Sequence, residues 1–399
     1  MEPELEVTDP PGSCLPLADG SRVDGARGLA SWSAGTPRAA GTLRAVGTPG
    51  AVGTPGAVGT PRAAGKTRLA RHRLAIGGQQ VTIAVGGRGI PLVLASGLLP
   101  TDRLYVQTLS RLASTGFRVV AADVAGSGAA SDGRGLDDYG RLLGRLLDEL
   151  GICRAILAGH SLGGRLVTEL AAGRPELAIA LLLVDAGVGA PWDELVRLMA
   201  VAPASIGVLG GMLLADTLGT VPLARDVEQA LKLSRLAAPV ALGHLSAPWR
   251  LLGPGLSALY APASVPLLNR IRQAEVPVMA VHGDCDLVVP LATARDAARR
   301  TAGELVVVHG GTHSWPLQDP ETLPAIVHEA LTGRLGRACT RAILDAGLDP
   351  VRASGREVEA AFLAEGALVR RLAPPDPPMP VAVRRARSPH YRWSRTDVT

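Results

Sequence analysis

The sequence predicts an α/β fold with a doubly wound, mostly parallel β-sheet. Short, continuous apolar segments recur along the chain, as is typical of strands that are covered on both faces. Segments with helical periodicity separate most of them, and this alternation of strand and helix produces a parallel sheet. Hydrophobic residues make up 47% of the 399 residues, so the chain can bury a large core.

The first 70 residues do not have this periodicity. Residues 35–64 form five hexads (GTPRAA, GTLRAV, GTPGAV, GTPGAV, GTPRAA), which offer little apolar surface to bury. We therefore predict that residues 1–70 are a low-complexity, disordered segment. The acidic N-terminus lacks the basic and apolar regions of a secretory signal.

The predicted strands begin with a hairpin. Residues 72–87 (HRLAIGGQQVTIAVGG) contain two short strands around a Gly-Gly turn. Six apolar strands follow, and helical stretches such as 136–151 and 290–303 lie between them. These strands are Pro91–Ala95, Arg118–Ala122, Arg154–Ala158, Ala180–Val184, Val278–Val281 and Leu305–Val308.

One interval, about 187–272, has no strand segment and is apolar with a helical pattern. Because it is inserted between two strands, we predict a helical cap over the carboxyl edge of the sheet, where open α/β sheets bind ligands. Its apolar residues would line an acyl pocket, touch a lipid surface or pack on the core, and these alternatives stay open. Trp192 and Trp249 either border the pocket or pack structurally.

The end of the chain reads as an extension of a main domain at 71–335. Residues 356–372 are helical in pattern, and a proline-rich spacer (373–380) and a basic end follow. We expect the basic end, with Tyr391 and Trp393, to be solvated and disordered rather than bound to lipid or nucleic acid. The net charge of +5 is modest and argues against a nucleic-acid-binding protein.

The cysteines predict a reducing compartment. Cys14, Cys153, Cys285 and Cys339 are far apart and form no C-x-x-C pair, so we expect four free thiols and no zinc site. The apolar run at 198–215 is interrupted by proline and glycine, which favours a buried or surface-dipping helix over a membrane span. We predict a cytoplasmic protein, with peripheral membrane contact through the cap as an alternative.

The strongest motif is Gly159-His160-Ser161-Leu162-Gly163, which follows a predicted strand and opens a helix. A serine at such a turn has a strained backbone, and small neighbours avoid clashes while the hydroxyl rises above the sheet edge. The motif resembles the nucleophile elbow of the α/β-hydrolase family, and the resemblance covers about residues 72–335. We expect His160 to be a wall of the substrate pocket.

The resemblance implies that an acid and a histidine follow the serine. In residues 282–290 (HGDCDLVVP) the family pattern places the acid at Asp286, with Asp284 as the near alternative and Asp185 as a distant one. In residues 309–323 (HGGTHSWPLQDPETL) it places the base at His313, with His309 as the alternative.

The resemblance also implies an oxyanion hole. The backbone N–H of Leu162 would be one donor, and that of Leu98 the other, in a loop where many relatives carry His-Gly and this chain has Ser96-Gly97. We expect Ser96 to border the substrate. Residues 123–132 (DVAGSGAASD) resemble a glycine loop of the family beside the site, and they equally fit an ordinary strand-to-helix turn.

A serine nucleophile excludes the family branches that use aspartate at the elbow. We therefore expect a serine hydrolase that cleaves a carboxylic ester with a hydrophobic acyl chain through an acyl-enzyme on Ser161, without a cofactor or metal. Its partner is a small ester or lipid-like molecule, not nucleic acid. The alternatives are an acyltransferase or carbon–carbon bond hydrolase with the same triad, and a catalytically silent binding protein.

Overall fold

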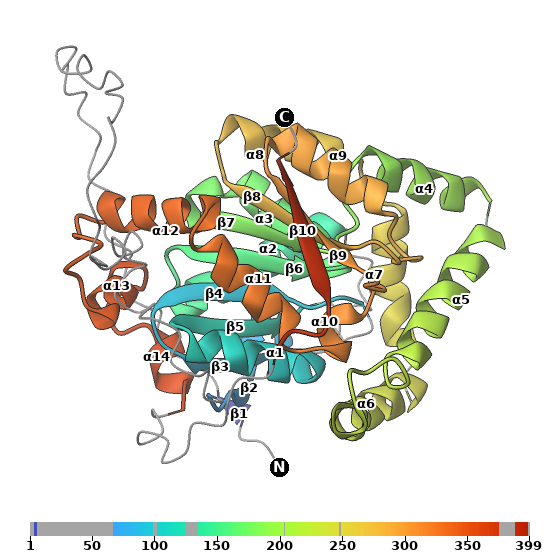
Figure 1. Cartoon of the computed structure of the whole chain (residues 1–399), viewed down its shortest axis with the longest axis horizontal. Coiled ribbons are helices and arrows are strands. Elements are labelled where there is room, and N and C mark those ends of the chain that lie inside the picture. The colour runs from blue at the N-terminus through green and yellow to red at the C-terminus, as the bar shows by residue number, and fades with distance from the viewer. Residues whose placement is uncertain are drawn as a thin grey trace, which may run out of the picture.

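A ten-stranded sheet forms the centre of the computed structural model (Figure 1). The structure describes residues 4–5, 67–98, 102–124, 135–202, 204–246, 249–374 and 388–397. The strand order is β1-β2-β3-β5-β4-β6-β7-β8-β9-β10. The strands are β1 (Glu4–Leu5), β2 (Ala70–Ile76), β3 (Gln79–Gly87), β4 (Ile90–Ala95), β5 (Phe117–Asp123), β6 (Ala155–His160), β7 (Ala178–Val184), β8 (Val278–Gly283), β9 (Glu304–His309) and β10 (Arg392–Asp397).

The sheet is mostly parallel, as the apolar segments predict. Strands β4 to β9 run parallel to one another, and β1 runs parallel to β2. The antiparallel pairs are β2 with β3, β3 with β5, and β9 with β10. The residues of β4 to β8 are all buried, which explains their continuous apolar sequences. Gly77 and Gly78 form the predicted hairpin turn with φ of 55° and 78°.

Helices cover both faces of the sheet. On one face α2, α3, α8 and α14 contribute to one hydrophobic cluster, and on the other face α1, α11, α12 and α13 contribute to a second. These helices and two more outside the cap are α1 (Asp102–Ser114), α2 (Leu136–Leu150), α3 (Leu162–Gly173), α8 (Val265–Gln273), α9 (Leu291–Thr301), α10 (Trp315–Gln318), α11 (Thr322–Ala330), α12 (Arg334–Asp345), α13 (Gly355–Ala361) and α14 (Leu368–Leu372).

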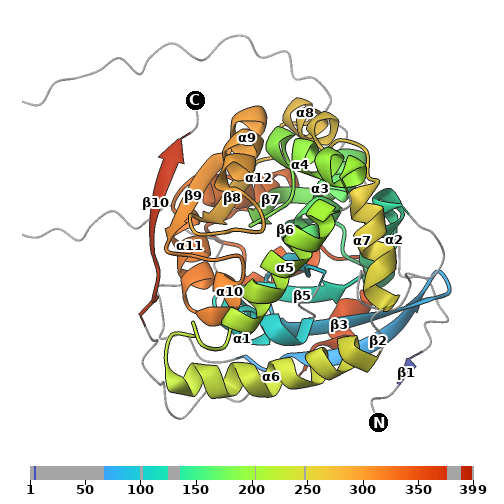
Figure 2. The same cartoon turned by 90° about the vertical axis from the view of Figure 1, so that its right-hand side faces the viewer.

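The predicted cap is present between β7 and β8 as four helices (Figure 2). The fifth helix of that interval, α8, buries Leu267, Leu268 and Ile271 in the core, so it belongs to the layer around the sheet. The cap is joined to this layer by Asp193, whose carboxylate accepts hydrogen bonds from Ser264 at the start of α8. The cap helices are α4 (Ala190–Val201), α5 (Ala204–Gly219), α6 (Val227–Ser246) and α7 (Trp249–Leu259).

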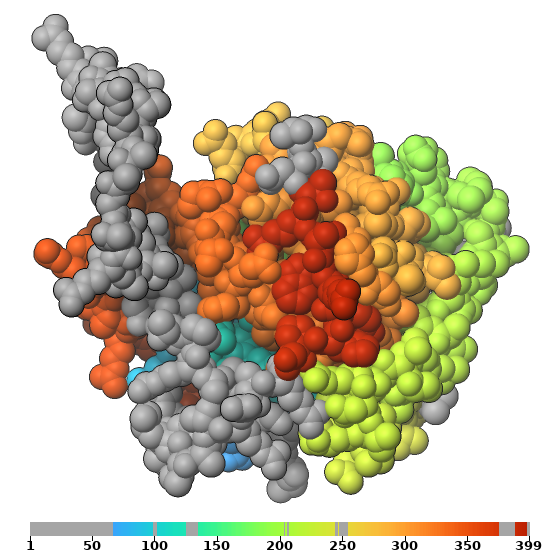
Figure 3. Space-filling model, viewed as in Figure 1, coloured from blue at the N-terminus to red at the C-terminus, as the bar shows by residue number. Residues whose placement is uncertain are grey.

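The end of the chain corrects one expectation. Residues 392–397 form β10, which pairs along the whole of β9 from Arg392 beside His309 to Asp397 beside Glu304. Figure 3 shows this segment in red, lying on the surface of the molecule. The prediction of a solvated, disordered end is therefore wrong for these residues, because they satisfy the open edge of β9.

The structure also tests the predictions about the cysteines, the membrane and the N-terminal segment. Cys153 is disulfide-bonded, while Cys285 and Cys339 are free, so the prediction of four free thiols is wrong. Among the described residues, every helix is too short or too polar to cross a membrane. The prediction that residues 1–70 are disordered is wrong for residues 4–5, which form β1, and for Ala70, which begins β2. Residues 6–66, and residues 125–132 of the glycine loop predicted at 123–132, lie outside the described residues.

Candidate active site

Ser161 lies at a sharp turn between β6 and α3. Its backbone has φ of 56° and ψ of −122°, a conformation that L-residues rarely adopt. Glycines allow the turn: a Cβ at Gly159 would lie 2.3 Å from the carbonyl oxygen of Gly163. A Cβ at Gly163 would lie 2.1 Å from the carbonyl oxygen of Ala95 at the end of β4. The elbow therefore brings Ser161 against the loop that follows β4.

His313 is the histidine that reaches Ser161. It follows β9, is 2% exposed, and its Nε2 lies 2.9 Å from Oγ of Ser161. Its Nδ1 lies 2.8 Å from Oδ2 of Asp286, which follows β8. The structure thus joins the three predicted residues into one hydrogen-bonded series in which a carboxylate orients the imidazole and the imidazole contacts the hydroxyl.

Asp286 is held as a carboxylate. Burial by itself raises its pKa, but the charge of His313 and the hydrogen bonds to the carboxylate outweigh burial and bring the pKa below its usual value. The backbone N–H groups of Val288 and Val289 each donate to Oδ1 at 2.8 Å. Asp286 therefore accepts the N–H of His313 with a fixed geometry.

The alternative acid and base form a pair of their own. Asp284 Oδ2 lies 3.0 Å from Nδ1 of His309 and its Oδ1 accepts the N–H of Gly310. The side chain of His309 is 49% exposed, and His309 does not line the cavity beside Ser161. This pair has nearly the same spacing in sequence as Asp286 and His313, so only the structure separates the two.

Asp185, the distant alternative, lies behind the triad. It is fully buried, has φ of 45° and accepts the N–H of Gly283 at 2.8 Å. Burial, with the nearby charge of Asp286, raises its pKa well above the usual value. A proton on Asp185 avoids a second negative charge beside Asp286.

Among the described residues, Asp185, His282 and Asp286 are close enough to share a metal ion. Their donor atoms are mostly committed: His282 Nε2 donates to the carbonyl of Val289 at 2.8 Å, and both oxygens of Asp286 accept hydrogen bonds. Within this group of three residues, Nδ1 of His282 and Oδ2 of Asp185 have no hydrogen-bond partner. These hydrogen bonds indicate that the three residues support the triad rather than coordinate a metal ion.

Leu98 and Leu162, the predicted oxyanion donors, both line the cavity beside Ser161. Gly97, which precedes Leu98, approaches the elbow so closely that a Cβ there would lie 3.2 Å from Cβ of Ser161. The loop after β4 and the first turn of α3 are thus adjacent, as an oxyanion hole requires.

Ser96 and His160 are placed differently from the prediction. Ser96 is 2% exposed and its hydroxyl faces the carbonyl of Ala122 and the carboxylate of Asp123. His160 is 1% exposed and bonds to Tyr105 and to the backbone of His313. Neither lines the cavity, because the hydroxyl of Ser96 is directed at β5 and the ring of His160 is directed at α1 and the loop after β9.

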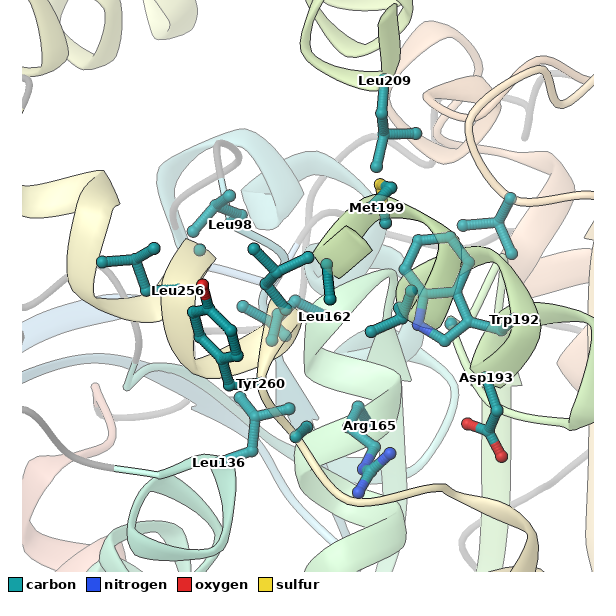
Figure 4. A pocket seen from close by; sticks show the side chains of 18 of the residues that line it. Leu98, Leu136, Leu162, Arg165, Trp192, Asp193, Met199, Leu209, Leu256 and Tyr260 are labelled. Carbon is teal, nitrogen blue, oxygen red and sulfur yellow. The ribbon is translucent and has the colours of Figure 1, made fainter. Parts of the chain in front are cut away.

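A cavity of about 530 Å³ opens above Ser161, between the sheet and the cap. Figure 4 shows Trp192 and Met199 of α4 on one side and Leu256 and Tyr260 on the other, with Leu162 between them. Trp192 therefore borders the cavity, whereas the side chain of Trp249 lies outside the described part of the chain. Further apolar residues of the lining are Leu98, Leu136, Val196, Leu209, Leu213, Leu259, Val288 and Val289.

Two of the three charged residues that line the cavity, Arg165 and Asp193, already have protein partners, and the third, Arg197, is exposed. Arg165 donates to Glu169 at 2.6 Å and to the carbonyl of Pro262 at 2.9 Å. Asp193 accepts the N–H and hydroxyl of Ser264 at 2.8 Å. The space beside Ser161 therefore favours an apolar group.

Comparison with known proteins agrees with this geometry. The model of the alpha/beta hydrolase family matches residues 92–325. The chain belongs to the alpha/beta hydrolase family. The hydrolase is 32% identical over 275 residues to a protein of Mycobacterium phage D29 provisionally named a non-heme haloperoxidase, covering 64% of this chain and 92% of that protein.

Two further proteins are similar to the hydrolase. It is 26% identical over 244 residues to the monoacylglycerol lipase of Mycolicibacterium smegmatis, covering 59% of this chain and 84% of the lipase. The crystal structure of the enol-lactonase from Burkholderia xenovorans LB400 has the same fold, with a TM-score of 0.51 and 19% identity over 65% of this chain and 100% of that one.

Proposed function

We propose that the hydrolase cleaves a carboxylic ester with a hydrophobic acyl chain, through an acyl-enzyme on Ser161. The observation that carries the proposal is the 2.9 Å contact of Ser161 with His313 at the floor of an apolar cavity. A serine attacks efficiently only when a base removes its proton, and an apolar cavity is the complement of an acyl chain.

The proposed reaction has two steps. His313 accepts the proton of Ser161 as Oγ attacks the ester carbonyl, and Asp286 stabilises the resulting imidazolium. The backbone N–H groups of Leu98 and Leu162 stabilise the oxyanion, and His313 returns its proton to the departing alkoxide. In the second step His313 takes a proton from water, which attacks the acyl-enzyme. His313 returns this proton to Oγ of Ser161 as the bond to the acyl group breaks and the acid is released.

The outer face of the cap supports a lipid surface as the source of this substrate. Twelve of the fifteen large hydrophobic residues that are exposed in the described chain lie between Leu198 and Tyr260. Three of these cap helices, α4, α5 and α7, also contribute residues to the cavity lining, so an acyl chain would pass from the exposed apolar face to Ser161 without crossing water. Asp216 is the single charge of α5, which suits an uncharged lipid surface.

Vesicles test the lipid contact. We expect the hydrolase to float with phosphatidylcholine vesicles, and Val208→Ser combined with Leu214→Ser to reduce the bound fraction severalfold. The control is Leu344→Ser, since Leu344 is 53% exposed on α12 and Leu214 is 56% exposed on the cap. Equal losses in both variants, or no binding by the wild type, would contradict the lipid contact and leave the ester proposal intact.

Two other activities would use the same residues. An acyltransferase passes the acyl group to an acceptor other than water, and added alcohols then compete with water in the second step. A carbon–carbon bond hydrolase would cleave a diketone. A catalytically silent binding protein is opposed by the joined contacts of Ser161, His313 and Asp286.

The first experiment uses p-nitrophenyl esters of increasing acyl length, with wild type beside Ser161→Ala. We expect the variant to lose activity by at least about a hundredfold, because Ser161 carries the covalent step. A fluorophosphonate probe should label the wild type and leave Ser161→Ala unlabelled. Activity that survives in Ser161→Ala would refute the proposed nucleophile.

A further inference from the structure

His160 directly precedes Ser161, yet its side chain points away from the cavity. It ends β6, is 1% exposed, and lies between two elements that are distant in sequence. Its Nε2 is 2.9 Å from the carbonyl oxygen of His313, and its Nδ1 is 2.7 Å from the hydroxyl of Tyr105 on α1. His160 therefore links helix α1 to the loop that carries the catalytic base.

The partners determine which nitrogen of His160 carries the proton. A carbonyl oxygen can only accept, so Nε2 must donate to His313. Nδ1 is then the acceptor and takes its hydrogen bond from Tyr105, whose hydroxyl stays protonated because burial raises its pKa well above the usual value. The donation thus runs in one direction, from Tyr105 through His160 to the backbone of His313.

His160 also stays uncharged. Burial, together with the neighbouring His313, lowers the pKa of His160 to about 3. The two rings have their centroids 4.9 Å apart. A charged His160 would repel the imidazolium that His313 becomes during the reaction, whereas a neutral ring leaves that cation undisturbed.

A second hydrogen bond also joins α1 to the segment after β9. It allows an effect on His313 itself to be distinguished from a general loss of stability. The hydroxyl of Thr108, also on α1, donates to the carbonyl of Pro316 at 3.0 Å. Thr108 lies one helical turn after Tyr105, and Pro316 lies three residues after His313. Both contacts join α1 to the segment that follows β9, but Thr108 reaches helix α10, whereas His160 contacts the backbone of His313 itself.

We propose that Tyr105 and His160 are positioning residues that hold His313 at the distance and angle needed to take the proton of Ser161. The pair touches neither the substrate nor the reacting atoms. Its loss should therefore slow the chemical steps without weakening substrate binding. This inference rests on the proposed catalytic role of Ser161 and His313.

The test compares variants that keep or remove the donor. His160→Gln retains an N–H near the place of Nε2, and His160→Leu removes it. We expect His160→Leu to lower kcat for a p-nitrophenyl ester at least tenfold with KM within about twofold of wild type, and His160→Gln to recover most of that loss. Tyr105→Phe, which removes one hydroxyl, should lower kcat in the same direction.

Thr108→Val is the matched control, since it removes the neighbouring hydrogen bond without touching His160. We expect its kcat to stay within about twofold of wild type although its melting temperature falls as much as that of Tyr105→Phe. Equal kcat losses in Thr108→Val and Tyr105→Phe, a loss expressed in KM, or equal activity of His160→Leu and His160→Gln would each overturn the proposal.

The rate of fluorophosphonate labelling separates this inference from the proposed function. The probe reports the reactivity of Ser161 without requiring the natural substrate. Labelling of the wild type with slower labelling of Tyr105→Phe supports the positioning pair. Labelling at equal rates overturns the pair alone, and an unlabelled wild type overturns the proposed function and the inference with it.

Discussion

The size of the acyl pocket can be altered at one glycine. Gly210 of α5 lines the cavity above Ser161, and a Cβ there would have no atom within 4 Å. A side chain at this position therefore begins in open space, and we expect a leucine to extend into the cavity. Gly207, one turn earlier on the same helix, is equally unobstructed and does not line the cavity, so Gly207→Leu is a matched control.

The expected effect follows from the burial of methylene groups. Each buried methylene contributes about 0.8 kcal/mol, which corresponds to about a fourfold change in kcat/KM. Gly210→Leu should exclude roughly three methylene groups and lower kcat/KM for long acyl chains by about 60-fold, while acetate esters react as before. Both leucine variants lose a helix glycine, so both should gain up to about 1 kcal/mol of helix stability.

The assay is kcat/KM for p-nitrophenyl acetate, butyrate, octanoate and dodecanoate with the wild type and both variants. We expect the ratio of dodecanoate to acetate activity to fall in Gly210→Leu and to stay constant in Gly207→Leu. An unchanged ratio in Gly210→Leu would show that the acyl chain does not enter this cavity. A fall in both variants would attribute the effect to the cap helix as a whole.

Three further predictions follow from the site and the strand at the end of the chain. Asp286→Asn should lower kcat by about a thousandfold or more because the tautomer of the base is lost, whereas Asp284→Asn should change kcat by less than about threefold; comparable losses would contradict the assignment of the acid. Because the pKa of Asp185 is raised on folding, the folded protein keeps a proton that the unfolded chain loses above about pH 4, and stability falls as pH rises from there. Asp185→Asn should therefore gain stability relative to wild type between pH 4 and 8, measured by urea unfolding, and parallel curves would contradict a protonated Asp185. Deletion of residues 388–399 exposes the edge of β9, so melting temperature should fall and light scattering should rise; unchanged scattering would contradict a protective role of β10.

Local sequence was sufficient to predict the buried strands and the turn that carries Ser161. A strand covered on both faces needs apolar residues throughout, so an apolar run such as Pro91–Ala95 predicts a buried strand. The turn at Ser161 needs small neighbours on both sides, and Gly159 and Gly163 make this requirement visible in the sequence. These features depend on contacts between neighbours in the chain or on burial alone.

The sequence contained weaker signals for the tail strand β10 and for the contact between Tyr105 and His160. The tail strand β10 has polar and basic residues because one side of an edge strand faces water, so Arg392–Asp397 resembled a disordered end. The link from Tyr105 to His160 joins residues 55 positions apart, and no local pattern marks it. A histidine beside the nucleophile was the only hint of that link.

By itself the sequence determined the fold class, the position of the nucleophile and two candidates each for the near acid and the base. The tertiary structure decided between them, because Asp284 with His309 and Asp286 with His313 are nearly equivalent in spacing. Only the second pair ends beside Ser161, at 2.9 Å, and the first lies on the surface. A catalytic contact depends on distances of a few ångströms between separate loops, and these distances exist only once the sheet has brought the loops together.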